Sequence, residues 1–153
     1  MTRRLTALIG VLVIAAGSTA VAGAAAKHRA TKHRFNIVAQ LHATKTDTQG
    51  VLEFKGSVTG TQGRGTAVSH NKLLSATSST ATAVVSYRKG TVSSFYAVTQ
   101  RATADGFAFT GTGHITGGTG IFRHARGSNL KLAGTAGKTL QTATFRITGT
   151  ITY

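Results

Sequence analysis

A glycine-rich stretch, residues 115–128 with the sequence ITGGTGIFRHARGS, combines flexible backbone with arginine and histidine side chains. The turn motif within it is Gly117, Gly118, Thr119 and Gly120. A phosphate-binding loop would need Lys-Ser or Lys-Thr after the last glycine, followed by a helix. Gly120 is instead followed by Ile121 in strand-like sequence, which excludes that interpretation. The glycines favour a sharp hairpin turn between a strand ending near Ile115 and a strand containing residues 121–123, because glycine adopts positive φ at little cost.

The ionisable side chains around this motif are the candidate ligand-binding residues. They are Arg123, Arg126, His124 and His114, and Tyr96 joins them from an earlier strand. In a small β-protein an arginine lies either in water or inside beside a partner, since an unpaired buried guanidinium is costly. A histidine near a ligand can act as a general acid or base. The histidines are irregularly spaced and Cys is absent, so we predict no metal site and no cofactor.

Carboxylates are too few for most hydrolytic mechanisms, because the chain holds only 3 Asp and Glu residues. Asp105 precedes Gly106, which is typical of a turn, and Asp47 lies in a loop-like stretch. A hydrolase with paired carboxylates is therefore not indicated. No nucleophile elbow is present either, and no catalytic residue is assigned.

The elements that must position these residues are strands. Apolar and polar residues alternate in ATFRITGTITY, and the residues that share its apolar face are Phe145, Ile147, Ile151 and Tyr153. Similar runs repeat from residue 35 onward between glycine-bearing turns, and we predict residues 71–79 to be the longest loop. This pattern is typical of an all-β sandwich or closed barrel. Closure is favoured because the chain has neither disulfides nor prolines to protect open edges.

The beginning of the chain has the organisation of a secretory signal peptide. Residues 1–26 hold a short basic start, an apolar run and small residues at the end, so we expect cleavage and an extracellular protein. The apolar run is short for a membrane span, and no later stretch is apolar enough to form one. Residues 27–34 form a basic segment that we expect to be a solvated tail. A single domain then occupies residues 35–153.

The net charge of the chain is +15, and it becomes +13 once Arg3 and Arg4 leave with the signal peptide. Such a charge favours anionic partners. The tail supplies four candidate contacts to an anionic cell-envelope polymer, which are Lys27, Arg29, Lys32 and Arg34. Specific nucleic-acid binding is not indicated, because basic residues are not interleaved with exposed stacking aromatics and Trp is absent.

The segment GGTGIFRHARGS closely resembles the GGTGxFRxARG signature of dirigent proteins and of the wider allene oxide cyclase-like barrel families. The matching positions are Gly117, Gly118, Thr119, Gly120, Phe122, Arg123, Ala125, Arg126 and Gly127. GSVTGTQGRGTAV at residues 56–68 is similar to their first glycine-rich hairpin, and ATFRITGTITY to their last strand. The likeness therefore covers nearly the whole chain after the predicted signal peptide.

This resemblance implies an eight-stranded antiparallel closed β-barrel of calycin type, whose cavity holds a small apolar or phenolic ligand. Because plant members are often trimeric, it also implies a homo-oligomer. The family's catalytic residues do not carry over. Their early His-Asp pair would fall within residues 39–42, which read AQLH here, and Glu53 is the only glutamate.

Three functional hypotheses follow from the sequence. The first is a secreted dirigent-like barrel that binds a small apolar or phenolic molecule without catalysis. The second is a structural or adhesive module held at the cell envelope by its positive charge. The third is a cyclase or isomerase, which needs a carboxylate pointing into the cavity near Arg123 or Arg126.

Overall fold

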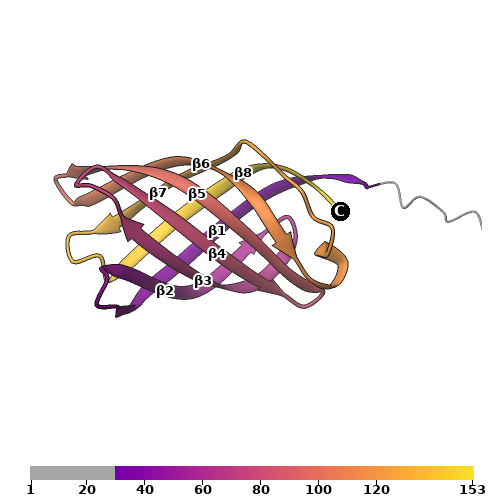
Figure 1. Cartoon of the computed structure of the whole chain (residues 1–153), viewed down its shortest axis with the longest axis horizontal. Coiled ribbons are helices and arrows are strands. Elements are labelled where there is room, and N and C mark those ends of the chain that lie inside the picture. Colours follow the sequence, from indigo (N-terminus) through magenta and orange to yellow (C-terminus); the bar gives the residue numbers. More distant parts are fainter. Residues whose placement is uncertain (1–29) are drawn as a thin grey trace, which may run out of the picture.

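The computed structural model describes residues 30–153 as a closed antiparallel β-barrel in which each strand pairs with its neighbours in chain order (Figure 1). The elements are β1 (Lys32–Thr46), β2 (Val51–Gly60), β3 (Gly63–Leu73), β4 (Ser78–Tyr87), β5 (Gly90–Thr103), β6 (Gly106–Gly118), the 3-10 helix η1 (Gly120–Phe122), β7 (Leu130–Gly137) and β8 (Thr142–Thr152). Pairing of β1 with β8 closes the ring and places Ile37 opposite Ile147. The predicted eight-stranded closed barrel is confirmed.

The predicted alternation determines which side chains fill the barrel. In β8, Ile147 and Ile151 are buried inside while Arg146 is exposed outside. The largest fully buried side chains are Tyr96, Phe35, Phe122, Ile37, Leu130, Ile151, Val58 and Val92. An eight-stranded barrel is just wide enough to be filled by side chains or to hold one small ligand. The distribution of large and small inward residues therefore decides which of these two happens.

Two predicted boundaries differ from the structure. Residues 71–79 are not a long loop, because β3 continues to Leu73 and β4 begins at Ser78, which leaves only residues 74–77 between them. The basic segment is not a free tail either. β1 begins at Lys32, and the Lys32 and Arg34 positions pair with Thr152 and Thr150 of β8. Lys27, Arg29 and the predicted signal peptide lie outside the described residues.

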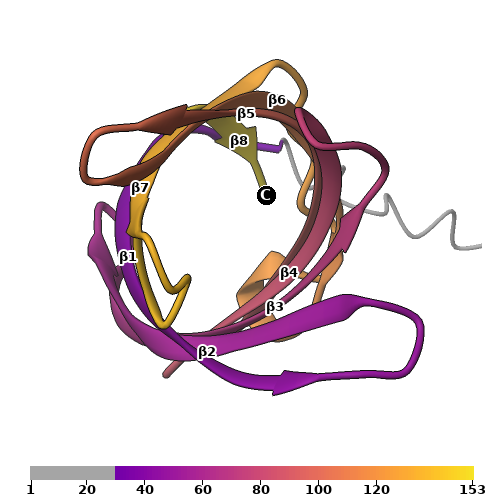
Figure 2. The same cartoon turned by 90° about the vertical axis from the view of Figure 1, so that its left-hand side faces the viewer.

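Successive antiparallel strands place their connections at alternate ends of the barrel, and the two ends differ (Figure 1). We call one the open end; it carries the β1–β2, β3–β4, β5–β6 and β7–β8 connections. Figure 2 views it and shows the β7–β8 connection bending inward across the opening. We call the other the closed end; it carries the turns at residues 61–62 and 88–89, the β6–β7 connection at residues 119–129, the start of β1 and the C-terminus.

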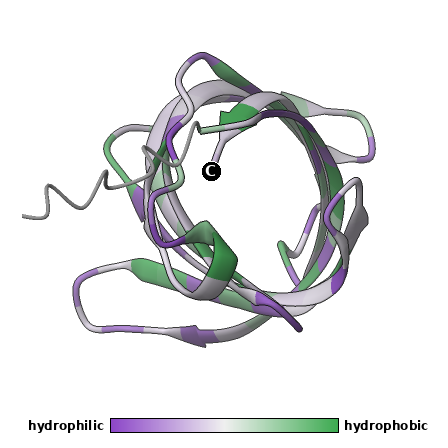
Figure 3. Cartoon of the chain, turned by 90° about the vertical axis from the view of Figure 1, so that its right-hand side faces the viewer, coloured by the Kyte–Doolittle hydropathy of each residue, from purple (hydrophilic) through white to green (hydrophobic). Residues whose placement is uncertain are grey.

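The closed end is filled by the β6–β7 connection. Figure 3 views this end and shows the short helix η1 lying over part of the ring. Phe122 on η1 is only 2% exposed, and Ala125 is fully buried. The Phe122 ring lies 4.8 Å from the ring of Tyr153 and 5.7 Å from that of Tyr87, measured between centroids. These aromatic contacts close this half of the barrel to solvent.

The Gly-Gly-Thr-Gly motif attaches this connection to the turn between β4 and β5. The Thr119 N–H donates to the carbonyl oxygen of Thr91 (3.0 Å), and the Thr91 N–H donates to Thr119 Oγ1 (3.0 Å). Gly120 has φ +59°, and a Cβ there would collide with the Lys89 carbonyl oxygen. The predicted tight hairpin with residues 121–123 in a strand is therefore wrong: the motif enters a 3-10 helix that turns Phe122 into the barrel.

The Arg126-Gly127 segment then completes the barrel wall between β6 and β8, where β7 does not reach. Arg126 exchanges two backbone hydrogen bonds with Thr152, at 2.9 and 2.8 Å. The Ile115 N–H donates to the carbonyl oxygen of Gly127 on the other side (2.8 Å). The residues that carry the family resemblance are therefore structural here. Thr119 anchors the connection, Phe122 fills the barrel and Arg126 completes its wall.

Candidate functional site

An apolar cavity of about 260 Å³ occupies the open half of the barrel. Its apolar lining is Leu52, Phe54, Leu73, Ala76, Phe107, Phe109, Ala136, Leu140, Ala143 and Phe145. The Phe109 ring lies between two other aromatic rings of this lining. Its centroid is 6.5 Å from that of Phe107 and 5.6 Å from that of Phe145. A cavity of about 150 Å³ lined by Leu, Ile and Phe binds benzene. The present cavity therefore suits a molecule somewhat larger than a single ring.

The cavity exists because small residues face inward along part of the wall. Ala136 and Ala143 lie opposite each other on β7 and β8, and Ala136 also lies opposite Phe107 of β6. Gly134 leaves room for the Phe145 ring to lie against the sheet, because a Cβ at this glycine would collide with that ring. Aromatic rings thus cover one part of the wall while alanines leave the space in front of it unfilled.

Four uncharged polar residues complete the cavity lining: Asn71, Ser75, Ser79 and Gln100. The Gln100 side-chain amide donates to the carbonyl oxygen of Ala76 (3.2 Å), and Ser79 Oγ donates to Gln100 Oε1 (3.4 Å). Asn71 Oδ1 accepts from Ser69 Oγ (3.3 Å), so its NH2 group is the donor best placed for a ligand. No charged side chain lines the cavity, which favours an uncharged ligand because burying an unpaired charge is costly.

The rim of the open end carries exposed aliphatic side chains. Leu73 is 50% exposed and Leu74 is 61% exposed, and both lie at the end of β3 beside the short β3–β4 loop. Leu140, in the β7–β8 connection, has φ +56° and lines the cavity. An apolar molecule would therefore meet apolar side chains at the entrance before it reaches the interior.

The candidate residues predicted from the sequence do not assemble at this cavity. Arg123, His124 and Arg126 are exposed in the β6–β7 connection at the closed end. His114 faces outward on β6, with its ring 5.6 Å from that of Phe95. His114 and Arg126 share a shallow depression with Lys32 on the outer surface.

Tyr96 is the only candidate that the structure places inside the barrel. It is 2% exposed, and it packs against the backbone of Gly113, where a Cβ would collide with its ring. Burial raises the pKa of Tyr96 to about 12. Tyr96 does not line the open-end cavity. Its position is that of a core residue that packs the middle of the barrel.

The residues that sequence reasoning missed are the open-end lining residues. Phe145 was expected on the apolar face of the last strand, but it was not grouped with Phe54 and Phe107 as a site. A usable signal was present in the order of the strands. In an antiparallel meander, the end of one strand and the start of the next lie at the same end, which places these three residues near the open end.

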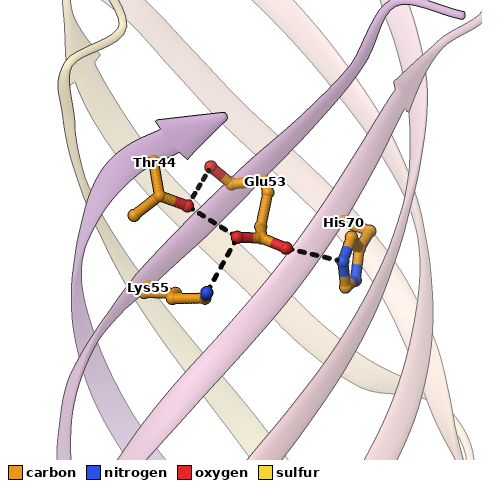
Figure 4. Close-up of polar contacts among 4 residues, drawn as sticks. All are labelled: Thr44, Glu53, Lys55 and His70. Carbon is orange, nitrogen blue, oxygen red and sulfur yellow. Dashed lines mark hydrogen bonds and ion pairs between the residues drawn. The ribbon is translucent and has the colours of Figure 1, made fainter. Parts of the chain in front are cut away.

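The three carboxylates all lie outside the cavity. Asp47 accepts hydrogen bonds from the backbone N–H groups of Gln49 and Val51 in its own turn, both at 2.8 Å. Asp105 forms the β5–β6 turn with Gly106, as predicted. Glu53 faces outward on β2 among polar side chains (Figure 4). The cyclase hypothesis therefore lacks the cavity carboxylate that it requires.

Glu53 is the centre of a polar cluster on the outer wall (Figure 4). Its Oε1 accepts from Lys55 Nζ (3.0 Å) and from Thr44 Oγ1 (2.8 Å), and its Oε2 lies 3.2 Å from His70 Nε2. The hydrogen bond from Lys55, followed by that from Thr44, lowers the pKa of Glu53 to about 2. The cluster connects three neighbouring strands and stabilises the wall beside the open end.

We expect Glu53→Gln to lower the free energy of unfolding at pH 7 because the neutral amide loses the ion pair with Lys55. Since the pKa of Glu53 is depressed in the folded protein, its contribution is complete above its ordinary value of 4.5 and is lost as pH falls towards about 2. Urea denaturation of both proteins across this range measures the difference. A difference that stays constant from pH 7 to pH 2 would contradict this assignment.

Comparison of the chain with protein-family models, with curated proteins and with solved structures finds no match. In residues 30–153, no group of three or more His, Asp or Glu side chains is arranged to hold a metal ion. The same residues contain no helix that is long and apolar enough to cross a membrane.

Proposed function

We propose that this protein is a secreted dirigent-like barrel that binds a small, uncharged apolar or phenolic molecule in its open-end cavity. The observation that carries the proposal is the lining of that cavity, which is aromatic and aliphatic, uncharged, and provided with a few amide and hydroxyl groups. Such a combination of apolar surface and few polar groups is typical of small-molecule sites. The glycine-rich motif and the signal-like N-terminus support the family and the extracellular location.

The ligand is bound rather than transformed in this proposal. None of the three Asp and Glu side chains lines the cavity, and the motif arginines Arg123 and Arg126 lie at the opposite end. A phenolic ring would lie against the Phe109 and Phe145 side chains, where offset or edge-to-face contacts are favourable. Its hydroxyl oxygen would accept a hydrogen bond from the side-chain NH2 group of Asn71, or its O–H would donate one to Gln100 Oε1.

A fluorescence displacement assay with the neutral probe N-phenyl-1-naphthylamine tests this function. We expect the probe to bind and 4-propylphenol to displace it at micromolar to millimolar concentrations. Two ligands of similar shape serve as matched controls, the anion 3-(4-hydroxyphenyl)propanoate and the cation tyramine. Both should bind at least tenfold more weakly, because the cavity offers no counter-charge. If neither the probe nor any neutral single-ring phenol binds, the proposed function is wrong.

A further inference from the structure

The charged side chains are distributed unevenly between the two ends of the barrel. Asp47 and Asp105 lie in open-end connections, and Glu53 lies near the open-end start of β2. The basic side chains at the closed end are Lys32, Arg34, Arg64, Arg88, Lys89, Arg123 and Arg126, and all of them are exposed. The closed end thus carries a concentrated positive charge, and no Asp or Glu side chain of the chain lies there to neutralise it.

Four separate segments bring these cations together. The start of β1 supplies Lys32 and Arg34, the β2–β3 hairpin supplies Arg64, the β4–β5 turn supplies Arg88 and Lys89, and the β6–β7 connection supplies Arg123 and Arg126. Hydrogen bonds to backbone carbonyl groups hold these segments in place. The Ile121 N–H donates to the Lys89 carbonyl oxygen (3.1 Å), and the Gln62 side-chain amide donates to the Arg34 carbonyl oxygen (3.0 Å). The positions of the charges are therefore determined by the fold.

Two grooves cross this basic surface. A groove of about 580 Å³ is lined by Gln62, Arg64, Arg88 and Lys89, among others. A second depression of about 560 Å³ is lined by Lys32, His114 and Arg126. Arginine binds phosphate and carboxylate groups through two parallel hydrogen bonds, which makes it well suited to oxyanions spaced along a chain.

We propose that the closed end is a binding surface for a linear polyanion that carries phosphate or carboxylate groups. The polymer would lie in the groove between Arg64 and the Arg88–Lys89 turn. The surface lies opposite the apolar cavity, so this interaction does not depend on the proposed ligand-binding function. It would hold the barrel on an anionic polymer while the open end remains accessible.

The surface is less suited to a bilayer or to a nucleic acid. Within residues 30–153, Ile121 is the one exposed large apolar side chain in the closed-end connections, whereas membrane-surface binding uses a wider apolar face. Tyr87 and Phe122 are buried, and the His33 and Tyr153 rings stack on each other with centroids 4.2 Å apart. Tyr87, Phe122 and Tyr153 line the groove, but the first two are buried and Tyr153 is already stacked on His33, so little aromatic surface remains for stacking unpaired bases.

The test compares two triple variants of the mature protein that have the same net charge. The first, Arg64→Gln with Arg88→Gln and Lys89→Gln, removes the cations of the groove. The control, Lys72→Gln with Arg101→Gln and Lys131→Gln, removes three exposed cations elsewhere on the barrel. Fluorescently labelled inorganic polyphosphate and polygalacturonate are the probes, and affinity is measured by anisotropy from 50 to 300 mM NaCl.

We expect the groove variant to lose at least tenfold in affinity for one or both probes, and the control variant to lose less than threefold. The slope of log affinity against log salt should decrease by about 2 in the groove variant, since each lost contact accounts for roughly 0.7. The probe that binds more tightly identifies phosphate or carboxylate as the preferred group.

Equal losses in the two variants would overturn the proposal, because they would show an effect of net charge alone. Tighter binding of wild type to oligo-dT or to phosphatidylglycerol vesicles than to either polymer would also overturn it. Displacement of N-phenyl-1-naphthylamine by 4-propylphenol is measured on both variants as well. This readout should equal that of wild type, so a failure of polyanion binding is distinguishable from a failure of the cavity.

Discussion

Phe122→Ala should lower the free energy of unfolding by about 3–5 kcal/mol, the usual cost of removing a fully buried phenylalanine side chain. Phe122 is 2% exposed and packs against the rings of Tyr87 and Tyr153. Its removal would leave a void at the closed end. Because small domains are stable by only about 5–15 kcal/mol, the effect should be large in urea denaturation followed by circular dichroism.

Ile121→Ala is the matched control for this prediction. Ile121 precedes Phe122 on the same 3-10 helix, but its side chain is 49% exposed. We expect this substitution to change the free energy of unfolding by less than about 1 kcal/mol, as most surface substitutions do. Similar losses in both variants would mean that Phe122 is not the residue that closes the barrel.

Ala136→Phe should abolish binding of the neutral probe while the protein stays folded. Ala136 faces the cavity from β7, opposite Phe107 and Ala143, and is 8% exposed. The added ring would occupy space that the structure leaves unfilled, so it competes with the ligand without forcing apart a packed core. We expect at least a tenfold loss of affinity for N-phenyl-1-naphthylamine and a melting temperature close to that of wild type.

Ala133→Phe makes the same chemical change on the opposite face of the same strand. Ala133 is exposed on the outside of β7, opposite Arg146 of β8. This variant should bind the probe as wild type does. Retained binding in Ala136→Phe would place the probe elsewhere, and loss of binding in both variants would show that the effect is not specific to the cavity.

The family resemblance directed attention to the end of the barrel opposite the apolar cavity. Arg123, Arg126 and His124 were expected beside the ligand because they surround the glycine motif. The structure gives that motif a different task, since Thr119 bonds to Thr91 and Phe122 fills the barrel. A sequence motif can therefore mark the connection that closes one end of a barrel, and the charged side chains of that motif then lie on the outer surface.

The sequence by itself predicted the fold class and which residues share one face of a strand. The alternation predicted that Ile147 and Ile151 share one face of the last strand and that Arg146 lies on the other, and the structure buries the first two and exposes Arg146. The physical reason is that side chains in a strand point to opposite faces in turn, so a period of two in hydrophobicity is visible along the chain. With no Cys and no Pro to protect open edges, closure was also predictable.

Only the tertiary structure decided which half of the barrel is filled and which is hollow. Period-two alternation shows which residues share a face of a strand, but not which side chains meet at one level of the barrel. That depends on strand register and on where residues 119–129 pack. Register brings Ala136 opposite Ala143, and the Thr119–Thr91 contact brings Phe122 into the other half. The Thr119–Thr91 contact joins residues that are 28 positions apart, and the register of a strand pair depends on the whole ring, so no local pattern records either.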